Sequence, residues 1–100
     1  MSERIAKIKD AIEVMHDCKA RHVASEPVIE LFRGGVAWDG VVETFELEGH
    51  PNAARCHAWS YEENGETQYV TVLEIPPVDS PSAAVTLAIA AKASQPNAKR

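Results

Sequence analysis

Apolar residues recur at helical spacing near the start of the chain. Their separations of three, four and three positions form one apolar stripe along a helix. Ser2 can cap the first turn, and Pro27 disfavours helical geometry at the residue before it. The pattern therefore predicts an amphipathic helix over residues 3–23. The stripe consists of Ile5, Ile8, Ile12 and Met15.

The next part of the chain has the shorter periodicity of strands. Residues 28–32 fit either a short strand or a further turn of helix. Residues 36–48 are predicted to form a strand, in which Val41, Glu43, Phe45 and Leu47 occupy alternate positions. Gly40 suggests a bulge within it. Residues 54–61 and 67–75 are both strand-like, and we expect two more strands there.

A tight hairpin is predicted between the last two strands. Asn64 and Gly65 stand between them, and Asn-Gly is the residue pair that a two-residue type I′ turn favours. Such a turn fixes the register, and it places opposite charges across from each other at its far end. The predicted pairs are Trp59 with Val70, His57 with Val72, Cys56 with Leu73, and Arg55 with Glu74.

The chain is predicted to close with a second helix. Ser80 and Pro81 provide a cap and a first-turn proline, and an alanine-rich helix follows over residues 82–93. We expect residues 95–100 to form a flexible tail. The fold class is therefore α+β, with an N-terminal amphipathic helix, an antiparallel sheet of three to four strands with a central hairpin, and a C-terminal helix. Residues 1–94 form its single domain.

Neither face of the predicted hairpin is polar. Cys56 and Leu73 lie on one face, and Trp59 and Val72 lie on the other. We expect the two helices to cover one face and to leave the Trp59 face for a partner or a ligand; the alternative is that the helices divide between the faces. A short chain has limited core volume, so the pattern predicts a homodimer or higher homo-oligomer.

Composition and charge narrow the class of protein. The chain has 100 residues, 45% hydrophobic and 25% charged, which is typical of a soluble globular domain. The net charge is −5, but residues 25–80 carry eleven acidic and two basic side chains. This acidic segment argues against nucleic-acid binding, and no apolar run is long enough for a membrane helix. Two cysteines and no apolar leader indicate a reducing cytoplasmic location.

Motifs for chemistry are scarce. Cys18 and His22 are four residues apart on the predicted helix, and His50, Cys56 and His57 supply further potential ligands. None of these has a zinc-motif spacing, so we expect no metal and no cofactor. A disulfide between the two cysteines is geometrically open but disfavoured in the cytoplasm.

Glu43 is the most informative polar residue, because it falls on an otherwise apolar strand face. A carboxylate there should be paired, shifted in pKa or used for binding. Nearby aromatic faces would allow a pocket for a cationic ligand. The alternatives are a register shift at Gly40 or a salt bridge to Arg33 or Arg55. The candidate ligand-binding residues are Trp38, Glu43, His57, Trp59 and Tyr69.

A resemblance to small bacterial proteins encoded on integron gene cassettes covers about half of the chain. It implies a bacterial cytoplasmic protein of accessory or adaptive role, often oligomeric, and it carries over no functional residue. The residues that carry it are Trp38-Asp39-Gly40, Phe45, Leu47, His50-Pro51, Ala53, Cys56 and Ala58-Trp59-Ser60.

The preferred hypothesis is a non-enzymatic oligomeric binding protein. Its site would lie on the sheet face or in a subunit cleft near Trp38, Glu43 and Trp59, and it would take a small or cationic ligand or a basic protein partner. A small acid–base enzyme that uses His50 or His57 with Glu43 is one alternative. A purely structural oligomerisation module, which needs no pocket, is the other.

Overall fold

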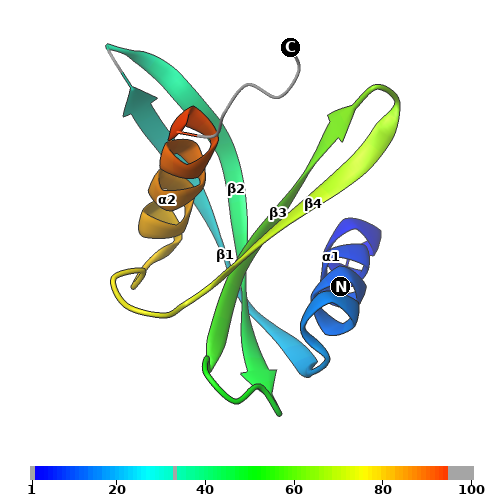
Figure 1. The fold of residues 1–100 in the computed structure, drawn as a ribbon. Coiled ribbons are helices and arrows are strands. Elements are labelled where there is room, and N and C mark those ends of the chain that lie inside the picture. Colours follow the sequence, from blue (N-terminus) through cyan, green and yellow to red (C-terminus); the bar gives the residue numbers. More distant parts are fainter. Residues whose placement is uncertain (1, 33, 95–100) are drawn as a thin grey trace.

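The computed structural model describes residues 2–32 and 34–94. In chain order it contains a helix, four strands and a second helix, so the α+β prediction is confirmed. The strands form one antiparallel sheet in the order β1-β2-β3-β4 (Figure 1). The elements are α1 Glu3–His16, β1 Lys19–Phe32, β2 Gly35–Glu48, β3 Arg55–Glu63, β4 Glu66–Leu73 and α2 Pro81–Ser94.

Helix α1 is shorter than the sequence predicted. Ser2 caps it, accepting the backbone N–H of Ile5 at 3.1 Å, but Asp17 adopts a left-handed conformation (φ 52°) and ends it. Residues 19–23 therefore belong to β1, and the expected helix over 3–23 is wrong beyond His16. The helical pairing of Cys18 with His22 is wrong for the same reason.

Strand β1 continues through residues 28–32, so the helical alternative for this segment is wrong. Its pairing with β2 is interrupted twice, between His22 and Ala24 and between Glu30 and Leu31. Gly40 pairs regularly with Val28, so the expected bulge at Gly40 is also wrong. Glycine at position 40 instead leaves room for the ring of Trp38, because a Cβ there would lie 3.1 Å from that ring.

The predicted hairpin is confirmed. Asn64 and Gly65 both have positive φ (56° and 81°), as a type I′ turn requires. The predicted pairs of Trp59, His57 and Cys56 with β4 all form. At the far end, the N–H of Glu74 donates to the carbonyl of Arg55 at 2.9 Å. Ser80 caps α2 by accepting the N–H of Ala83, so the predicted start of this helix is confirmed as well.

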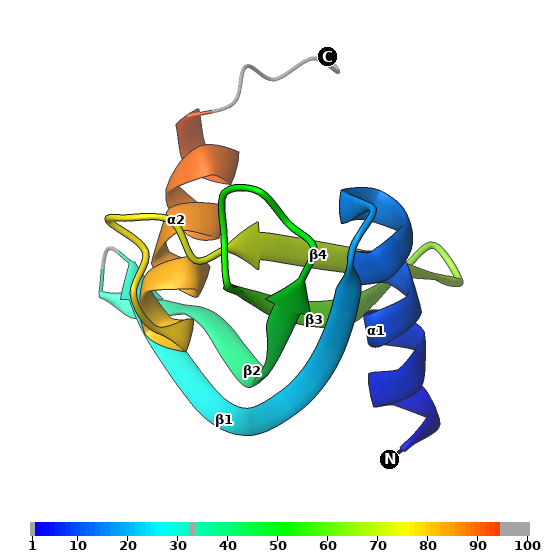
Figure 2. The same ribbon diagram turned by 90° about the horizontal axis from the view of Figure 1, so that it is seen from below.

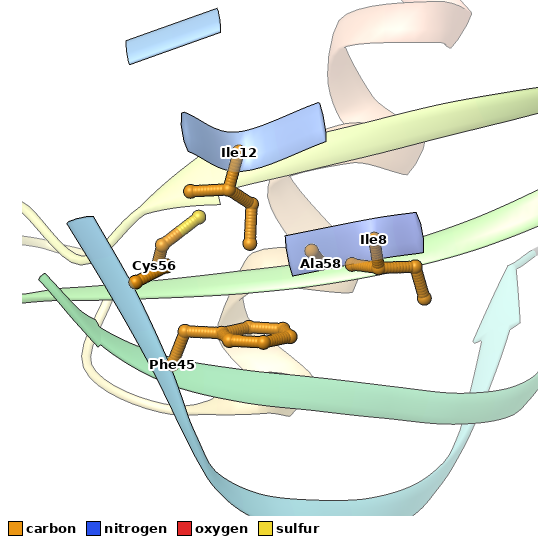
Figure 3. Close-up of a cluster of buried hydrophobic side chains, with 6 residues drawn as sticks. Ile8, Ile12, Phe45, Cys56 and Ala58 are labelled. Atoms are coloured by element: carbon orange, nitrogen blue, oxygen red, sulfur yellow. The ribbon is translucent and has the colours of Figure 1, made fainter. Parts of the chain in front are cut away.

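The two helices lie on opposite faces of the sheet, which corrects the expectation that both would cover one face (Figure 2). Both sheet faces are apolar, and each therefore needs its own cover. Under α1, Ile8 and Ile12 pack on Phe45 of β2 and on Cys56 and Ala58 of β3 (Figure 3). Under α2, the second cluster contains Val28, Val42, Trp59, Val78, Ala84 and Val85.

The sheet divides into two diverging hairpins. Strand β2 pairs with β3 only from Glu43 to Glu46, opposite Arg55 to Ala58. Beyond this short ladder the β1–β2 and β3–β4 ribbons separate (Figure 1). Neither helix is long and apolar enough to cross a lipid bilayer, as judged on the described part of the chain.

Candidate functional site

A large cavity lies between α2 and the β3–β4 hairpin, and it extends past β4 to His16 of α1. It has a volume of about 1340 Å³. Tyr61, Ile75 and Leu87 are 40–48% exposed at its rim, so it communicates with solvent. The strand residues are Trp38, Trp59, Tyr61, Val70, Thr71, Val72 and Leu73, and the others are His16, Ile75, Pro76, Pro77, Val78, Leu87, Ala88, Ile89 and Ala91.

Local sequence explains this lining. Trp59 and Tyr61 alternate along β3, so both point to the α2 side, and Val70 and Val72 lie beside them on β4. Helix α2 contributes small side chains such as Ala88, which leave space that larger residues would fill. The cavity therefore results from aromatic residues on the sheet facing a helix with an alanine-rich surface.

Two tryptophans form one wall of the cavity where the hairpins diverge. The rings of Trp38 on β2 and Trp59 on β3 meet edge to face, with centroids 5.2 Å apart. This contact joins two strands that no longer share hydrogen bonds at that level. A smaller hollow of about 370 Å³, lined also by Arg4, Asp39 and Ser60, adjoins the same pair.

The described part of the cavity wall carries almost no charge. Among its described lining residues, only His16 and Tyr61 have titratable side chains. Burial, together with the neighbouring His50, lowers the pKa of His16, so its imidazole is neutral at pH 7. The Nε2 atom of His16 lies 2.8 Å from the Thr71 hydroxyl. Because none of the described wall residues carries a carboxylate, the cavity suits a neutral apolar molecule better than a cation.

The predicted site residues divide between the two faces of the sheet. Trp38 and Trp59 line the cavity together. Tyr69 packs on the opposite cluster beneath α1. Glu43 also faces α1, because it is adjacent on β2 to Val42, which points to the α2 side. His57 points to the α2 side but does not line the cavity. The structure thus brings together the two tryptophans and separates them from Glu43.

Glu43 is the centre of a buried polar cluster. Its side chain is fully buried and forms a salt bridge with Arg4 of α1. The expected partner Arg55 pairs with Glu46 instead, and the other expected partner, Arg33, lies outside the described residues. The carboxylate also accepts a hydrogen bond from the hydroxyl of Ser25, and its Oε1 atom lies 2.8 Å from Nε2 of His22. Burial raises the pKa of Glu43, but the hydrogen bonds from Ser25, Arg4 and His22 outweigh it and lower the pKa below its ordinary value. Glu43 is therefore a paired carboxylate that anchors α1 to the sheet.

The histidines proposed for acid–base chemistry have other partners. His57 is buried between the Thr44 hydroxyl at 2.9 Å and the Glu74 carboxylate at 2.8 Å. His50 Nδ1 accepts the backbone N–H groups of Asn52 and Ala53. The described side chains thus contain two histidine–carboxylate pairs, His22–Glu43 and His57–Glu74, but neither lines the cavity.

Both cysteines are free thiols. Burial raises the pKa of the Cys56 thiol to about 12, and it also raises the pKa of Cys18, helped by Glu13 and Asp17. The thiol form is a poor nucleophile and a poor metal ligand. Within residues 2–32 and 34–94, no group of three or more potential metal ligands occurs.

Several cavity residues were missed from the sequence. Tyr61, Leu87 and Ala88 line it, and the alternation of Tyr61 with Trp59 was a usable signal. The contribution of α2 had no such signal, because it depends on which face of the sheet the helix covers.

The chain matches no protein family model, no curated protein and no solved structure.

Proposed function

We propose that this protein is a non-enzymatic binding protein that holds a small, uncharged, largely apolar molecule between α2 and the β3–β4 hairpin. The observation that carries the proposal is the cavity of about 1340 Å³ with two tryptophans and a predominantly aliphatic wall. Ligand sites in proteins are concave and mostly apolar, with a few polar groups that fix orientation. His16, Thr71 and Tyr61 are the polar groups available here.

The proposal includes self-association in a reducing, bacterial cytoplasmic setting. Free thiols at Cys18 and Cys56 agree with such a compartment. The apolar side chains of Leu31, Val36 and Leu87 are between 48% and 67% exposed. Contact with another subunit would remove such apolar surface from water, which supports self-association.

The two alternatives receive less support. An acid–base enzyme needs its histidine and carboxylate beside a space that a substrate can enter. Glu43 is fully buried and points away from the cavity, and His57 is buried between Thr44 and Glu74. A purely structural module needs no cavity, so the size of this one favours ligand binding.

Filling the cavity tests the proposal. Trp38 and Trp59 are the only tryptophans in the chain, and both line the cavity, so tryptophan fluorescence reports on molecules that bind beside this pair. We expect uncharged N-phenyl-1-naphthylamine to quench this fluorescence and to raise the melting temperature. In Ala88→Phe, whose new ring would occupy the cavity, binding should weaken roughly tenfold or more, equivalent to about 1.4 kcal/mol. The matched control is Val14→Phe, because Val14 is 83% exposed on the opposite helix.

The charge preference can be measured with the same assay. The cation phenyltrimethylammonium should produce no comparable quenching, because none of the described lining residues carries a carboxylate. Equal binding of the neutral probe to wild type and Ala88→Phe would place the site elsewhere. Quenching by the cation alone would restore the cationic-ligand hypothesis, and no response to either probe would count against the proposed function.

A further inference from the structure

The sheet has two outer edges, and they differ in how well they are protected. Strand β1 forms one edge and β4 forms the other. An unprotected edge presents free backbone N–H and C=O groups to any strand that approaches it. The sequence and pairing of each edge strand therefore show whether it can accept a further strand.

The β1 edge carries several features that oppose pairing. Pro27 in its middle lacks an N–H donor. The register shift at Val23 bends the strand locally. Charged side chains occur along most of its length, at Lys19, Arg21, Glu26 and Glu30. Proline, a bulge and edge charges are the devices by which natural sheets avoid edge-to-edge contact.

The β4 edge has none of these features. Its pairing with β3 runs without interruption from Glu66 to Leu73. It contains no proline, and Glu66 at its start is its only charged residue. The remaining residues are mostly aromatic or β-branched, the types that strands favour. This edge is suited to accept another strand.

The outward-facing backbone groups of β4 can be identified. Glu63 and Glu66 flank the two-residue turn, so they form a hydrogen-bonded pair. Every second residue after Glu66 then bonds to β3, which agrees with the bond from the Glu74 N–H to Arg55. The N–H and C=O groups of Thr67, Tyr69 and Thr71 consequently point away from the sheet.

Apolar surface flanks this edge on both faces. Met15 of α1 is 54% exposed, and its sulfur lies 3.8 Å from the Thr71 hydroxyl. Leu87 of α2 is 48% exposed on the other face. The cavity is lined from both faces of the sheet at β4. His16 and Leu73 line it from the α1 side, and Val70 lines it from the α2 side. Figure 2 shows β4 at the far side of the sheet from β1, with α1 and α2 on either side.

We propose that a second copy of this chain occupies the β4 edge, with the two β4 strands paired antiparallel in one eight-stranded sheet. The edge is self-complementary under a two-fold axis, because each copy offers the same donors and acceptors at Tyr69 and Thr71. Antiparallel pairing places the two Glu66 side chains at opposite ends. Met15 and Leu87 of each copy then lie beside the seam between the copies, where their exposed apolar surface can be covered.

This inference rests on the self-association in the proposed function but not on ligand binding. The second copy would lie along the stretch from Val70 to Leu73, which lines the cavity. Each copy would then complete the wall of its partner's site. The oligomeric state is measured on the protein without ligand. A negative result there would overturn the dimer but not the ligand site, and a negative result in the probe-binding assay would do the reverse.

The test removes one outward N–H from the edge. Wild type should sediment at about twice the monomer mass of 10.9 kDa when studied at roughly 100 μM, far above a micromolar dissociation constant. Thr71→Pro should be monomeric, because its proline removes the outward donor and leaves the β3 ladder intact. The matched control Thr71→Val should remain dimeric, since it loses the same hydroxyl contacts with His16 and Met15 but keeps the N–H.

A second variant and a second readout keep the inference testable if Thr71→Pro fails to fold by circular dichroism. Leu87→Asp changes an exposed residue beside the edge, and we expect it to weaken the dimer at least tenfold. Hydrogen exchange should also show protected amides at Tyr69 and Thr71 in wild type, with protection lost on dilution. A wild-type monomer, a folded Thr71→Pro dimer, a Leu87→Asp dimer of unchanged affinity, or rapid exchange at both amides would overturn the inference.

Discussion

Glu43 shows how a single carboxylate can be held inside an apolar face. A buried charge is strongly disfavoured unless it is paired and hydrogen-bonded. Arg4, His22 and Ser25 together supply those partners. Since Arg4 comes from α1 and the other two from β1, the carboxylate joins three elements at one point.

Glu43→Gln should therefore destabilise the fold. The amide keeps the shape of the side chain but cannot satisfy a guanidinium and a histidine as well as a carboxylate does. Because Arg4 is half exposed and can be solvated, we expect a loss of about 1–3 kcal/mol in the free energy of unfolding rather than a larger value. Urea denaturation at pH 7 measures it.

Ligand binding separates this structural role from a binding role. A folded Glu43→Gln protein should bind the neutral probe as wild type does, because Glu43 does not line the cavity. Weakened probe binding with unchanged stability would contradict this assignment.

At this scale the sequence predicted which residues were unusual but not what they contact. Strand alternation alone identified Glu43 on an apolar face, and it placed Trp59 on the face with Val72. The partner Arg4 lies 39 positions away from Glu43, and no local pattern reports such a contact. His22 was also assigned to a helix, so its proximity to Glu43 could not be foreseen.

Among the elements, the β3–β4 hairpin follows most directly from its sequence. Asn64 and Gly65 provide the two positive φ angles that the turn needs, and the register of the whole hairpin follows from that turn. This is why all the predicted cross-strand pairs form.

Gly65→Ala tests the turn. A side chain in the left-handed region costs about 1–2 kcal/mol, and Gly65 has a φ of 81°. We expect a comparable loss in the free energy of unfolding by urea. Gly35→Ala is the control, because Gly35 does not have a positive φ and a Cβ there meets nothing within 4 Å. Equal losses in both variants would mean that the turn conformation is not the cause.

The boundary between α1 and β1 could not be read from the sequence. Helices most often end at glycine in the left-handed conformation, whereas here Asp17 adopts it. Lys19, Ala20 and Arg21 have high intrinsic helix propensity, but pairing with β2 overrides it and makes residues 19–23 part of a strand. Pro27 was interpreted as a boundary, but an edge strand tolerates proline. The interruptions at Val23 and Ala37 depend on pairing in the same way.

At the scale of the whole molecule, charge and apolar surface explain how the parts combine. The acidic middle of the chain meets basic side chains from outside it, as Arg4 pairs with Glu43 and Arg21 pairs with Glu46. Two apolar sheet faces require two helices, one on each face. The sequence showed that both faces were apolar, but it could not determine where each helix would dock.

The same arrangement predicts how stability depends on pH. Burial and the neighbouring His50 lower the pKa of His16 in the folded protein. At a pH below the ordinary pKa of 6.5, His16 is therefore protonated to a greater extent in the unfolded chain than in the folded chain. Stability should be highest above this value and should fall as the pH decreases from 7.5 to 5.5, by at most about 1.4 kcal/mol per pH unit for one group.

His16→Gln should reduce this fall, because glutamine can still bond to the Thr71 hydroxyl but does not titrate. The measurement is urea denaturation at both pH values. Glu13→Gln on the same helix is the control. Hydrogen bonds from the Ala20 N–H and from Lys9 lower the pKa of Glu13, so its carboxylate stays ionised across this range and the substitution should cost the same stability at each pH. If His16→Gln left the pH dependence unchanged, the acid sensitivity would arise at another histidine, and the junction between α1 and β4 would not be its source.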